Sequence, residues 1–156
     1  MARCSSGSTN KGALGKKPGP GYVLRLRDTD GDGNADQINQ FAKMDHPRGL
    51  FFDNPKLWVL HPPLLSVFHD EDHDGTADRQ EVLIKGITTN PNAHARSRPH
   101  QTQRHSMGID GWLYIAVGDF GFVKATAADG RQMTPRGGGV LRIRPDGRKW
   151  KSTRGA

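Results

Sequence analysis

Two acidic segments carry the residues best suited to chemistry in this chain, and both have the spacing of cation ligands. Residues 70–81 read DEDHDGTADRQE, with aspartate at the first, third and fifth positions, glycine at the sixth and glutamate at the twelfth. Clustered carboxylates repel one another unless a hard cation neutralises them, and glycine permits the sharp turn that folds them inward. This spacing matches the EF-hand calcium loop. The candidate calcium ligands are Asp70, Asp72, Asp74, Asp78 and Glu81.

The second acidic segment, residues 28–39, reads DTDGDGNADQIN and follows the same pattern through its ninth position. Its twelfth residue is Asn39, which cannot supply the bidentate carboxylate of the full pattern. The candidate ligands in this segment are Asp28, Asp30, Asp32 and Asp36.

The residues that flank these segments predict strands rather than the helices of an EF-hand. Residues 23–27 (VLRLR) and 65–69 (LSVFH) alternate between apolar and polar side chains, which is the period of a half-buried strand. Each acidic segment is therefore predicted to be the turn of a β-hairpin. Two readings stay open, a turn that holds calcium and a solvated acidic turn without an ion, since Asp and Gly are favoured in turns in either case.

An internal repeat links the two acidic segments. VLRLRDTDGDGNADQINQF starts at Val23, and LSVFHDEDHDGTADRQEVL starts 42 residues later at Leu65. A second pair of segments, residues 49–60 and 107–116, shares the pattern of strand, Asp-containing turn and strand. Short strands recurring every 40–45 residues or so are typical of β-propeller blades.

The chain is therefore predicted to be all-β, with residues 22–156 forming an incomplete β-propeller of about three blades. Propellers close with roughly 4–8 blades. We expect the chain to be a fragment of a longer protein, because an open set of blades leaves sheet edges bare. Residues 1–21, rich in Ser, Gly, Lys and Pro, are predicted to be a disordered basic lead-in.

Composition excludes several classes of protein. The single cysteine, Cys4, excludes an internal disulfide framework and a CxxC zinc site. No apolar run approaches the roughly 18 residues of a membrane span. The net charge is +7, but the basic residues are scattered over polar segments without interleaved aromatic residues, so we expect no nucleic-acid site.

A histidine–aspartate pattern carries a resemblance to a known family. His100 stands eight residues before Gly108, which opens the run GIDGWLY, and Gly118 and Asp119 follow the predicted strand. This pattern resembles the soluble quinoprotein glucose dehydrogenase and glucose/sorbosone dehydrogenase family. The acidic hairpins and the run GGGVLRIRPDG at 137–147 are also similar to the propeller domain of bacterial membrane-bound dehydrogenases of that superfamily.

The resemblance implies a six-bladed propeller that binds pyrroloquinoline quinone (PQQ) with calcium and oxidises a sugar or alcohol. By carry-over, His100 is the general base, Asp119 orients it, and Arg104 contacts the cofactor. A neutral imidazole is the usual base near pH 7, and a carboxylate beside it fixes its tautomer. The family often has Asn after the histidine, whereas this chain has Gln101. The family's other cofactor contacts lie in later blades.

Other readings of the same residues stay open. His100 is also compatible with an exposed loop histidine, Asp119 with a turn cap, and Arg104 with a strand residue that faces solvent. The alternative function is a non-catalytic propeller, stiffened by calcium, that binds a protein or carbohydrate partner. The resemblance implies a periplasmic or secreted protein, although residues 1–21 contain no signal peptide. The sequence names neither the substrate nor the electron acceptor.

Overall fold

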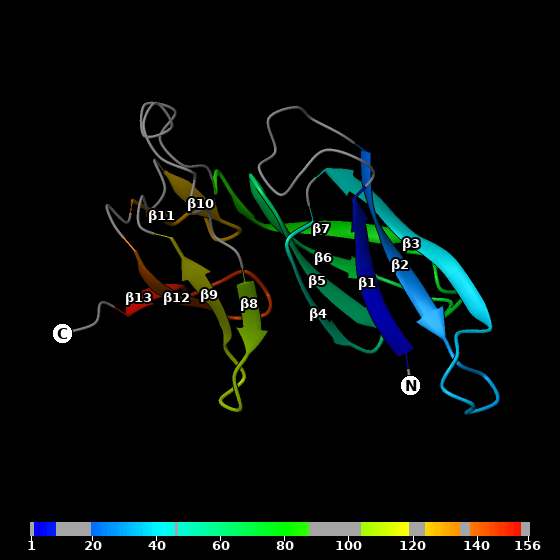
Figure 1. Cartoon of the computed structure of the whole chain (residues 1–156). Coiled ribbons are helices and arrows are strands. Elements are labelled where there is room, and N and C mark those ends of the chain that lie inside the picture. Colours follow the sequence, from blue (N-terminus) through cyan, green and yellow to red (C-terminus); the bar gives the residue numbers. More distant parts are fainter. Residues whose placement is uncertain are drawn as a thin grey trace.

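The computed structural model describes residues 2–8, 20–45, 47–87, 104–118, 124–134 and 138–153. These residues form strands, turns and bends and contain no helix, which confirms the all-β prediction. The strands make three antiparallel sheets, none of which closes on itself (Figure 1).

The first sheet has three strands in the order β1–β2–β3. Its members are β1 (Ala2–Ser8), β2 (Pro20–Arg27) and β3 (Gln37–Asp45). Strand β1 departs from the predicted disorder over residues 1–21, because its backbone pairs with β2 from Ala2 opposite Arg27 to Ser8 opposite Gly21. Backbone pairing of this kind needs no apolar side chain, so the Ser-rich and Gly-rich sequence gives no sign of it.

The second sheet is a four-strand meander extended at one edge, in the order β11–β10–β7–β6–β5–β4. The meander comprises β4 (Gly49–Asp53), β5 (Lys56–His61), β6 (Leu64–His69) and β7 (Arg79–Lys85). The short strands β10 (Ala125–Ala127) and β11 (Gln132–Met133) come from later in the chain, and β10 pairs with β7 while β11 pairs with β10.

The third sheet has the order β13–β12–β9–β8. Its strands are β8 (Arg104–Met107), β9 (Leu113–Val117), β12 (Gly139–Ile143) and β13 (Lys151–Thr153). The segment that joins β9 to β12 contains β10 and β11, so this segment ties the third sheet to the second.

The second sheet is buried on both faces. Along β5, Leu57 and Val59 point into one apolar core and Trp58 and Leu60 into another, as the two-residue period of a strand requires. The first core is shared with the first sheet through Val23, Phe41 and Met44. The second core is shared with the third sheet through Leu113, Ile115, Val117, Leu141 and Ile143. The three sheets therefore pack in sequence, with the second in the middle.

The sequence repeat is also a structural repeat. The β2–β3 register shifts between Val23 and Leu24, and the β6–β7 register shifts 42 residues later, between Leu65 and Ser66. The extra residues at these two bulges, Phe41 and Leu83, are 1% and 0% exposed. Because the bulge recurs at the same repeat position, the equivalent side chain in each sheet points into an adjacent core.

The β2–β3, β6–β7 and β8–β9 turns lie at one end of the strands, which we call the turn end (Figure 1), whereas the β5–β6 turn lies at the other end. Trp58, near the start of β5, donates its indole N–H to the carbonyl oxygen of Pro145 in the β12–β13 turn at 3.2 Å, which aligns the second and third sheets. At the other end, the connection end, Gly49 at the start of β4 lies against His105 at the start of β8. Both acidic segments are turns at the turn end.

Candidate functional site

The first acidic loop, residues 28–36, is organised by hydrogen bonds from its own backbone to its carboxylates. The Asp28 carboxylate accepts the N–H groups of Gly31 at 2.6 Å and Gly33 at 3.0 Å. The Asp36 carboxylate accepts both the N–H and the hydroxyl of Thr29 at 2.6 Å. These bonds stabilise the ionised forms, so they lower the pKa of Asp28 and of Asp36.

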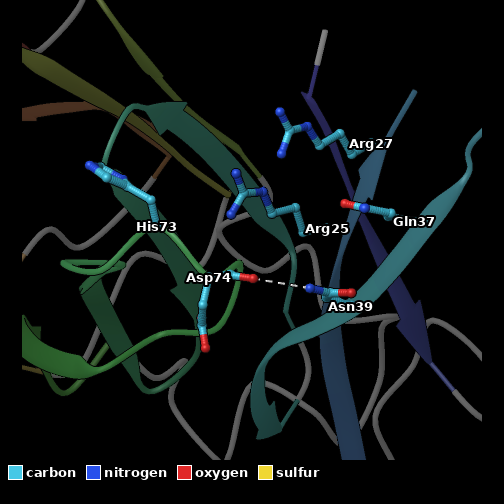
Figure 2. A pocket seen from close by; sticks show the side chains of 6 residues that line it. All are labelled: Arg25, Arg27, Gln37, Asn39, His73 and Asp74. Carbon is cyan, nitrogen blue, oxygen red and sulfur yellow. Dashed lines mark hydrogen bonds between the residues drawn. The ribbon is translucent and has the colours of Figure 1, made fainter. Parts of the chain in front are cut away.

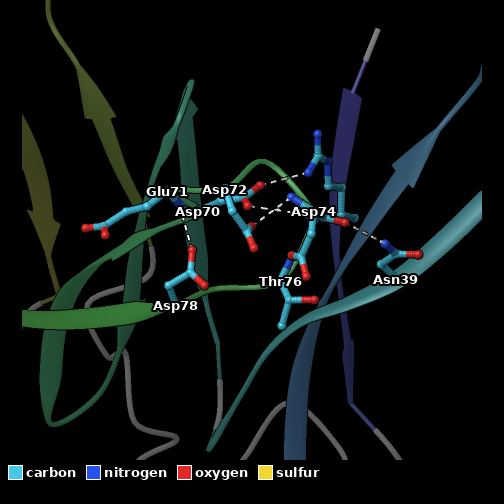
Figure 3. Close-up of polar contacts among 9 residues, drawn as sticks. Asn39, Asp70, Glu71, Asp72, Asp74, Thr76 and Asp78 are labelled. Carbon is cyan, nitrogen blue, oxygen red and sulfur yellow. Dashed lines mark hydrogen bonds and ion pairs between the residues drawn. The ribbon is translucent and has the colours of Figure 1, made fainter.

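The second acidic loop, residues 70–78, repeats this arrangement (Figure 3). The Asp78 carboxylate accepts the N–H of Glu71 at 2.7 Å, and the Asp70 carboxylate accepts the N–H of Gly75 at 3.4 Å. The closing backbone bond is also the same: the Asp36 N–H donates to Arg27 and the Asp78 N–H donates to His69, both at 2.9 Å. The two loops thus have one geometry on two hairpins.

Both loops take a left-handed backbone at their fourth and sixth residues. The fourth residues are Gly31, with φ 83°, and His73, with φ 63°; the sixth are Gly33, with φ 91°, and Gly75, with φ 96°. Glycine enters this region freely, whereas a side chain raises its energy. The left-handed residues curl each loop so that its acidic side chains face one another.

Three carboxylates gather in each loop, with ligand atoms that all lie within 4.8 Å of one another. They come from the first, third and ninth loop positions: Asp28, Asp30 and Asp36 in one loop and Asp70, Asp72 and Asp78 in the other. Carboxylate oxygens converging at this spacing are a ligand set for a hard cation such as calcium.

Three of the nine sequence-predicted ligands lie outside these groups among the described residues. Asp32 accepts the backbone N–H and side-chain amide of Asn34, and Asp74 accepts the backbone N–H of Thr76. Glu81 lies on β7, where its carboxylate is 3.7 Å from the His69 imidazole and 3.5 Å from the Arg79 guanidinium. The EF-hand pattern includes Glu81 because it assumes a helix after the loop, and a strand directs the twelfth residue elsewhere.

Among the described residues, the second loop but not the first is docked on a neighbouring sheet. Arg25 of β2 places its guanidinium 2.8 Å from the Asp70 carboxylate, which is 2% exposed. Asn39 of β3 donates its side-chain amide to the Asp74 carbonyl at 3.1 Å, and Ala77 donates its N–H to the Phe41 carbonyl at 2.8 Å. Sequence reasoning missed Arg25, because the next repeat has Val67 at the same position and the pattern marks only carboxylates.

Residues 6–156 match the family described as a domain of unknown function, DUF7133. The chain belongs to this family. No curated protein and no solved structure matches the chain. The family description gives no activity, so the functional argument depends on the residues themselves. Within the described residues, no helix is long and apolar enough to cross a membrane.

Of the residues predicted for catalysis and cofactor contact, the structure describes only Arg104. His100 and Asp119 lie outside the described residues, and Arg104 is the first residue of β8. Arg104 pairs with Ala116 of β9, so the chain enters β8 and leaves β9 together at the connection end. A strand as long as β9 spans about 17 Å at ~3.4 Å per residue. Any cation bound at the turn end is therefore remote from the start of β8 and the end of β9.

The GIDGWLY run forms the tight β8–β9 turn. Asp110 accepts the Tyr114 hydroxyl at 2.8 Å and the Trp112 N–H at 3.3 Å, and the Tyr114 bond is the main reason that the pKa of Asp110 is lowered. The guanidinium groups of Arg142 and Arg144 lie 4.7 and 4.2 Å from the centre of the Trp112 ring. In the structure Asp110 shapes the β8–β9 turn, and these contacts explain the residues of the GIDGWLY run by local structure.

Gly75 and Gly33 offer a matched test of loop docking. A Cβ at Gly75 would lie 2.9 Å from Asn39 Nδ2 and 3.0 Å from Arg25 Nη1, whereas a Cβ at Gly33 would meet nothing within 4 Å. Because both glycines have φ above 90°, each alanine substitution should cost about 1 kcal/mol through backbone strain. Gly75→Ala should cost about 1 kcal/mol more through crowding. Urea unfolding of both variants measures the difference, and equal losses would contradict the docking geometry.

Proposed function

We propose that this chain is a non-catalytic, calcium-stiffened β-repeat domain whose two acidic loops each bind one calcium ion. The observation that carries the proposal is the pair of equivalent three-carboxylate groups, each within 4.8 Å, at the tips of two hairpins related by the repeat. Calcium takes 6–8 oxygen ligands in flexible geometry. Three carboxylates, some of them bidentate, together with backbone carbonyls and water, supply such a set.

Charge favours a cation most strongly at the first loop. In the described part of the chain, no ion pair reaches Asp28, Asp30 or Asp36, whereas Asp70 is paired with Arg25. Two like charges about 5 Å apart repel by roughly 1 kcal/mol even in water, and three pairs act in each group. A bound divalent cation converts this repulsion into attraction, so we expect the first loop to depend more on calcium than the second.

The repeat supports a propeller-like arrangement for the three sheets, with each sheet one blade. The outer face of the first sheet carries Leu24, Leu26 and Ile38, and Ile38 is 61% exposed. Their equivalents 42 residues later, Ser66, Phe68 and Gln80, are on the face of the second sheet that packs against the first. Because the outer face of the first sheet is equivalent to a face of the second sheet that is packed, the repeat favours a further sheet of the same kind against that outer face. In this arrangement, calcium would hold the hairpin tips at one end of the blades.

Thermal unfolding with millimolar calcium and with a chelator tests the calcium proposal. A ligand that binds only the folded state stabilises it by about 2.7 kcal/mol at a hundred times its Kd, so the midpoint should rise with calcium. Asp36→Asn and Asp78→Asn should each reduce the rise, and the double variant should abolish it.

Asp53→Asn, at the end of β4 and outside both loops, is the matched control and should keep the full response. Magnesium at the same concentration controls for ionic strength, because it demands a tighter octahedral geometry. An unchanged midpoint in calcium, or a rise that survives in the double Asn variant, would leave only solvated acidic turns.

A second candidate function is that of a PQQ-dependent sugar or alcohol dehydrogenase, as the sequence resemblance implies. The specific observation in its favour is the β8–β9 register, which brings the start of β8 and the end of β9 together. His100 precedes the first of these ends by four residues and Asp119 follows the second by two. In this proposal His100 takes the proton of the substrate hydroxyl and Asp119 holds the imidazole, while the quinone supplies the hydride acceptor. The turn-end carboxylates take no part.

Dye reduction with aldoses, measured after adding PQQ and calcium to the full chain and to a version extended beyond Ala156, tests this second candidate. Turnover should fall at least a hundredfold in His100→Ala, the loss typical of removing a general base. His73→Ala, at the turn end, should keep full turnover. Turnover that ignores His100→Ala would remove the proposed base, and no turnover in either chain would remove the candidate.

A further inference from the structure

Strand β12 of the third sheet repeats strand β2 of the first sheet. Residues 140–144 read VLRIR, and residues 23–27 read VLRLR. In the third sheet, Leu141 and Ile143 point into the core shared with the second sheet. The valine and the two arginines of this run therefore lie on the opposite face, directed away from the second sheet, which we call the outer face of the third sheet.

In the first sheet, the same run receives the acidic loop of the next sheet. The Arg25 guanidinium lies 2.8 Å from the Asp70 carboxylate, and Asn39 of the neighbouring strand donates to the Asp74 carbonyl at 3.1 Å. Figure 2 shows Arg25 and Asn39 directed from the first sheet towards the second acidic loop. Within this molecule, an arginine at the third position of the run is thus the binding partner of an acidic loop.

The junction between the second and third sheets uses the same position of the turn. Trp58 of β5 donates its indole N–H to the carbonyl oxygen of Pro145 at 3.2 Å. Pro145 directly follows the run VLRIR, as Asp70 directly follows the equivalent run LSVFH. At both junctions, therefore, the preceding sheet binds the residue that follows this strand. The equivalent residue of the first sheet is Asp28, which directly follows VLRLR.

The outer face of the third sheet exposes the residues that are covered in the first sheet. Val140 is 39% exposed and the Arg142 side chain is 30% exposed, whereas Val23 is fully buried and the Arg25 side chain is 17% exposed. Tyr114 lies opposite Arg142 on β9, so an aromatic side chain stands beside the arginine on this face. Aromatic residues and arginine are the residue types enriched at protein–protein interfaces.

The arginines of this face are held in place before any partner binds. The guanidinium carbons of Arg142 and Arg144 lie 4.7 and 4.2 Å from the centre of the Trp112 ring, as in cation–π contacts. The only ion pair of Arg142 in the described structure is with Asp110, at 3.7 Å, which is longer than the Arg25–Asp70 pair. Two arginines and one aspartate give the surface around Trp112 a net positive charge.

The outer face of the first sheet has the complementary character. It carries Leu24, Leu26 and Ile38 beside the first acidic loop, and Ile38 is 61% exposed. Asp28 has the repeat position of Asp70, and no ion pair reaches it in the described part of the chain. The first sheet thus presents the same apolar face and acidic loop with which the second sheet packs on the first.

We propose that two copies of this chain associate head to tail, with the outer face of the first sheet of one copy on the outer face of the third sheet of the other. The Asp28 carboxylate of one copy then pairs with the Arg142 guanidinium of the other, as Asp70 pairs with Arg25 within the chain. Opposite charges within an apolar contact fix its register and exclude wrong partners.

The number of sheets predicts that this contact closes into a dimer. A contact between two different faces forms either a closed ring or an open filament. Two copies of a three-sheet chain supply six sheets, which is within the roughly 4–8 that close a propeller. In the ring, each copy contributes both of its outer faces, so the dimer contains the contact twice. The proposal rests on the propeller-like arrangement put forward above and does not require calcium.

Sedimentation velocity of the full chain in the micromolar range tests the dimer, which should appear as a reversible species of twice the monomer mass. Arg142→Glu and Asp28→Arg each bring like charges together in both contacts, so each should weaken dimerisation by at least about a hundredfold. An equal mixture of the two variants should dimerise as the native chain does, because the mixed dimer contains one native and one reversed charge pair.

The controls carry the same charge changes on the middle sheet. Lys85→Glu on β7 and Asp53→Arg on β4 are exposed positions outside both faces, and each should leave the dimer unchanged. Ile38→Lys replaces an exposed side chain, so it leaves the cores intact, and it should weaken dimerisation about tenfold by placing a charge in the apolar contact.

The measurement is made in calcium and in a chelator, and a dimer in either buffer supports the interface. A monomer in both buffers, a dimer that ignores Ile38→Lys and both charge reversals, or an assembly larger than two copies would overturn the proposal. A dimer whose thermal midpoint does not respond to calcium would remove the calcium proposal alone. A monomer whose midpoint rises with calcium would remove the dimer alone.

Discussion

Replacing Arg25 by methionine is expected to lower the free energy of unfolding by about 3 kcal/mol, because it strands a buried carboxylate. Arg25 and Asp70 are 2.8 Å apart, with side chains 17% and 2% exposed. Removing one partner of a buried pair leaves an unpaired charge out of water, which costs far more than the pair contributes. Methionine keeps most of the arginine's apolar stem, so the loss reports charge rather than packing. Urea unfolding at neutral pH with a chelator measures the loss, so that no cation in the second loop compensates the Asp70 charge.

A double-mutant cycle separates the charge from the contact. Asp70→Asn in the Arg25→Met background removes the stranded charge, so the double variant should recover more than half of the lost stability. Arg27→Met, two residues along the same strand face, should cost less than about 0.5 kcal/mol as an exposed arginine. Equal losses from Arg25→Met and Arg27→Met would show that the ion pair does not hold the second loop.

The features that the sequence predicts correctly all depend on local order. Alternation at Val23–Arg27 and Leu65–His69 identified the strands β2 and β6, although β6 is buried on both faces rather than half-buried, and the recurrence of the acidic motif identified equivalent hairpins. Asp and Gly at fixed offsets determine the loop itself, because each carboxylate binds N–H groups only a few residues away. Interactions this short in sequence are visible in a linear motif.

The features that the sequence did not predict join residues far apart in the chain. The Arg25–Asp70 pair spans 45 residues. Strand β1 forms through backbone pairing, which its Ser and Gly residues do not predict. The end of the sheet at which each turn lies depends on how many strands separate two motifs. The strand register was therefore needed to place the acidic loops at one end of the sheets and the start of β8 and the end of β9 at the other.

His105 is the clearest case of a residue that the sequence does not single out and the structure buries. It is 7% exposed in β8, and its Nε2 lies 3.1 Å from the Trp58 carbonyl oxygen, so Nε2 carries the proton in the neutral ring. Nδ1 is buried without a partner in the described structure, and a Cβ on Gly49 would lie 2.7 Å from it. Burial lowers the pKa of His105 to about 4, because a second ring proton would have no acceptor.

Acidification from pH 6.5 to pH 4 is therefore expected to cost the protein about 3 kcal/mol through His105 alone. Between these pH values the unfolded chain binds a proton at His105 and the folded protein does not. The contribution of His105 to the free energy of unfolding is therefore fully present above pH 6.5 and is lost as the pH falls to 4. His105→Gln keeps an N–H donor for Trp58 without titrating, and should remove most of this loss of stability in urea unfolding measured at successive pH values.

His69, whose pKa is also lowered by burial, accounts for a smaller pH dependence that remains. The Asp28 and Asp36 carboxylates have pKa values below 3.8, so their contribution is lost only at lower pH. A His105→Gln profile as steep as that of the native protein would place the acid-sensitive group elsewhere.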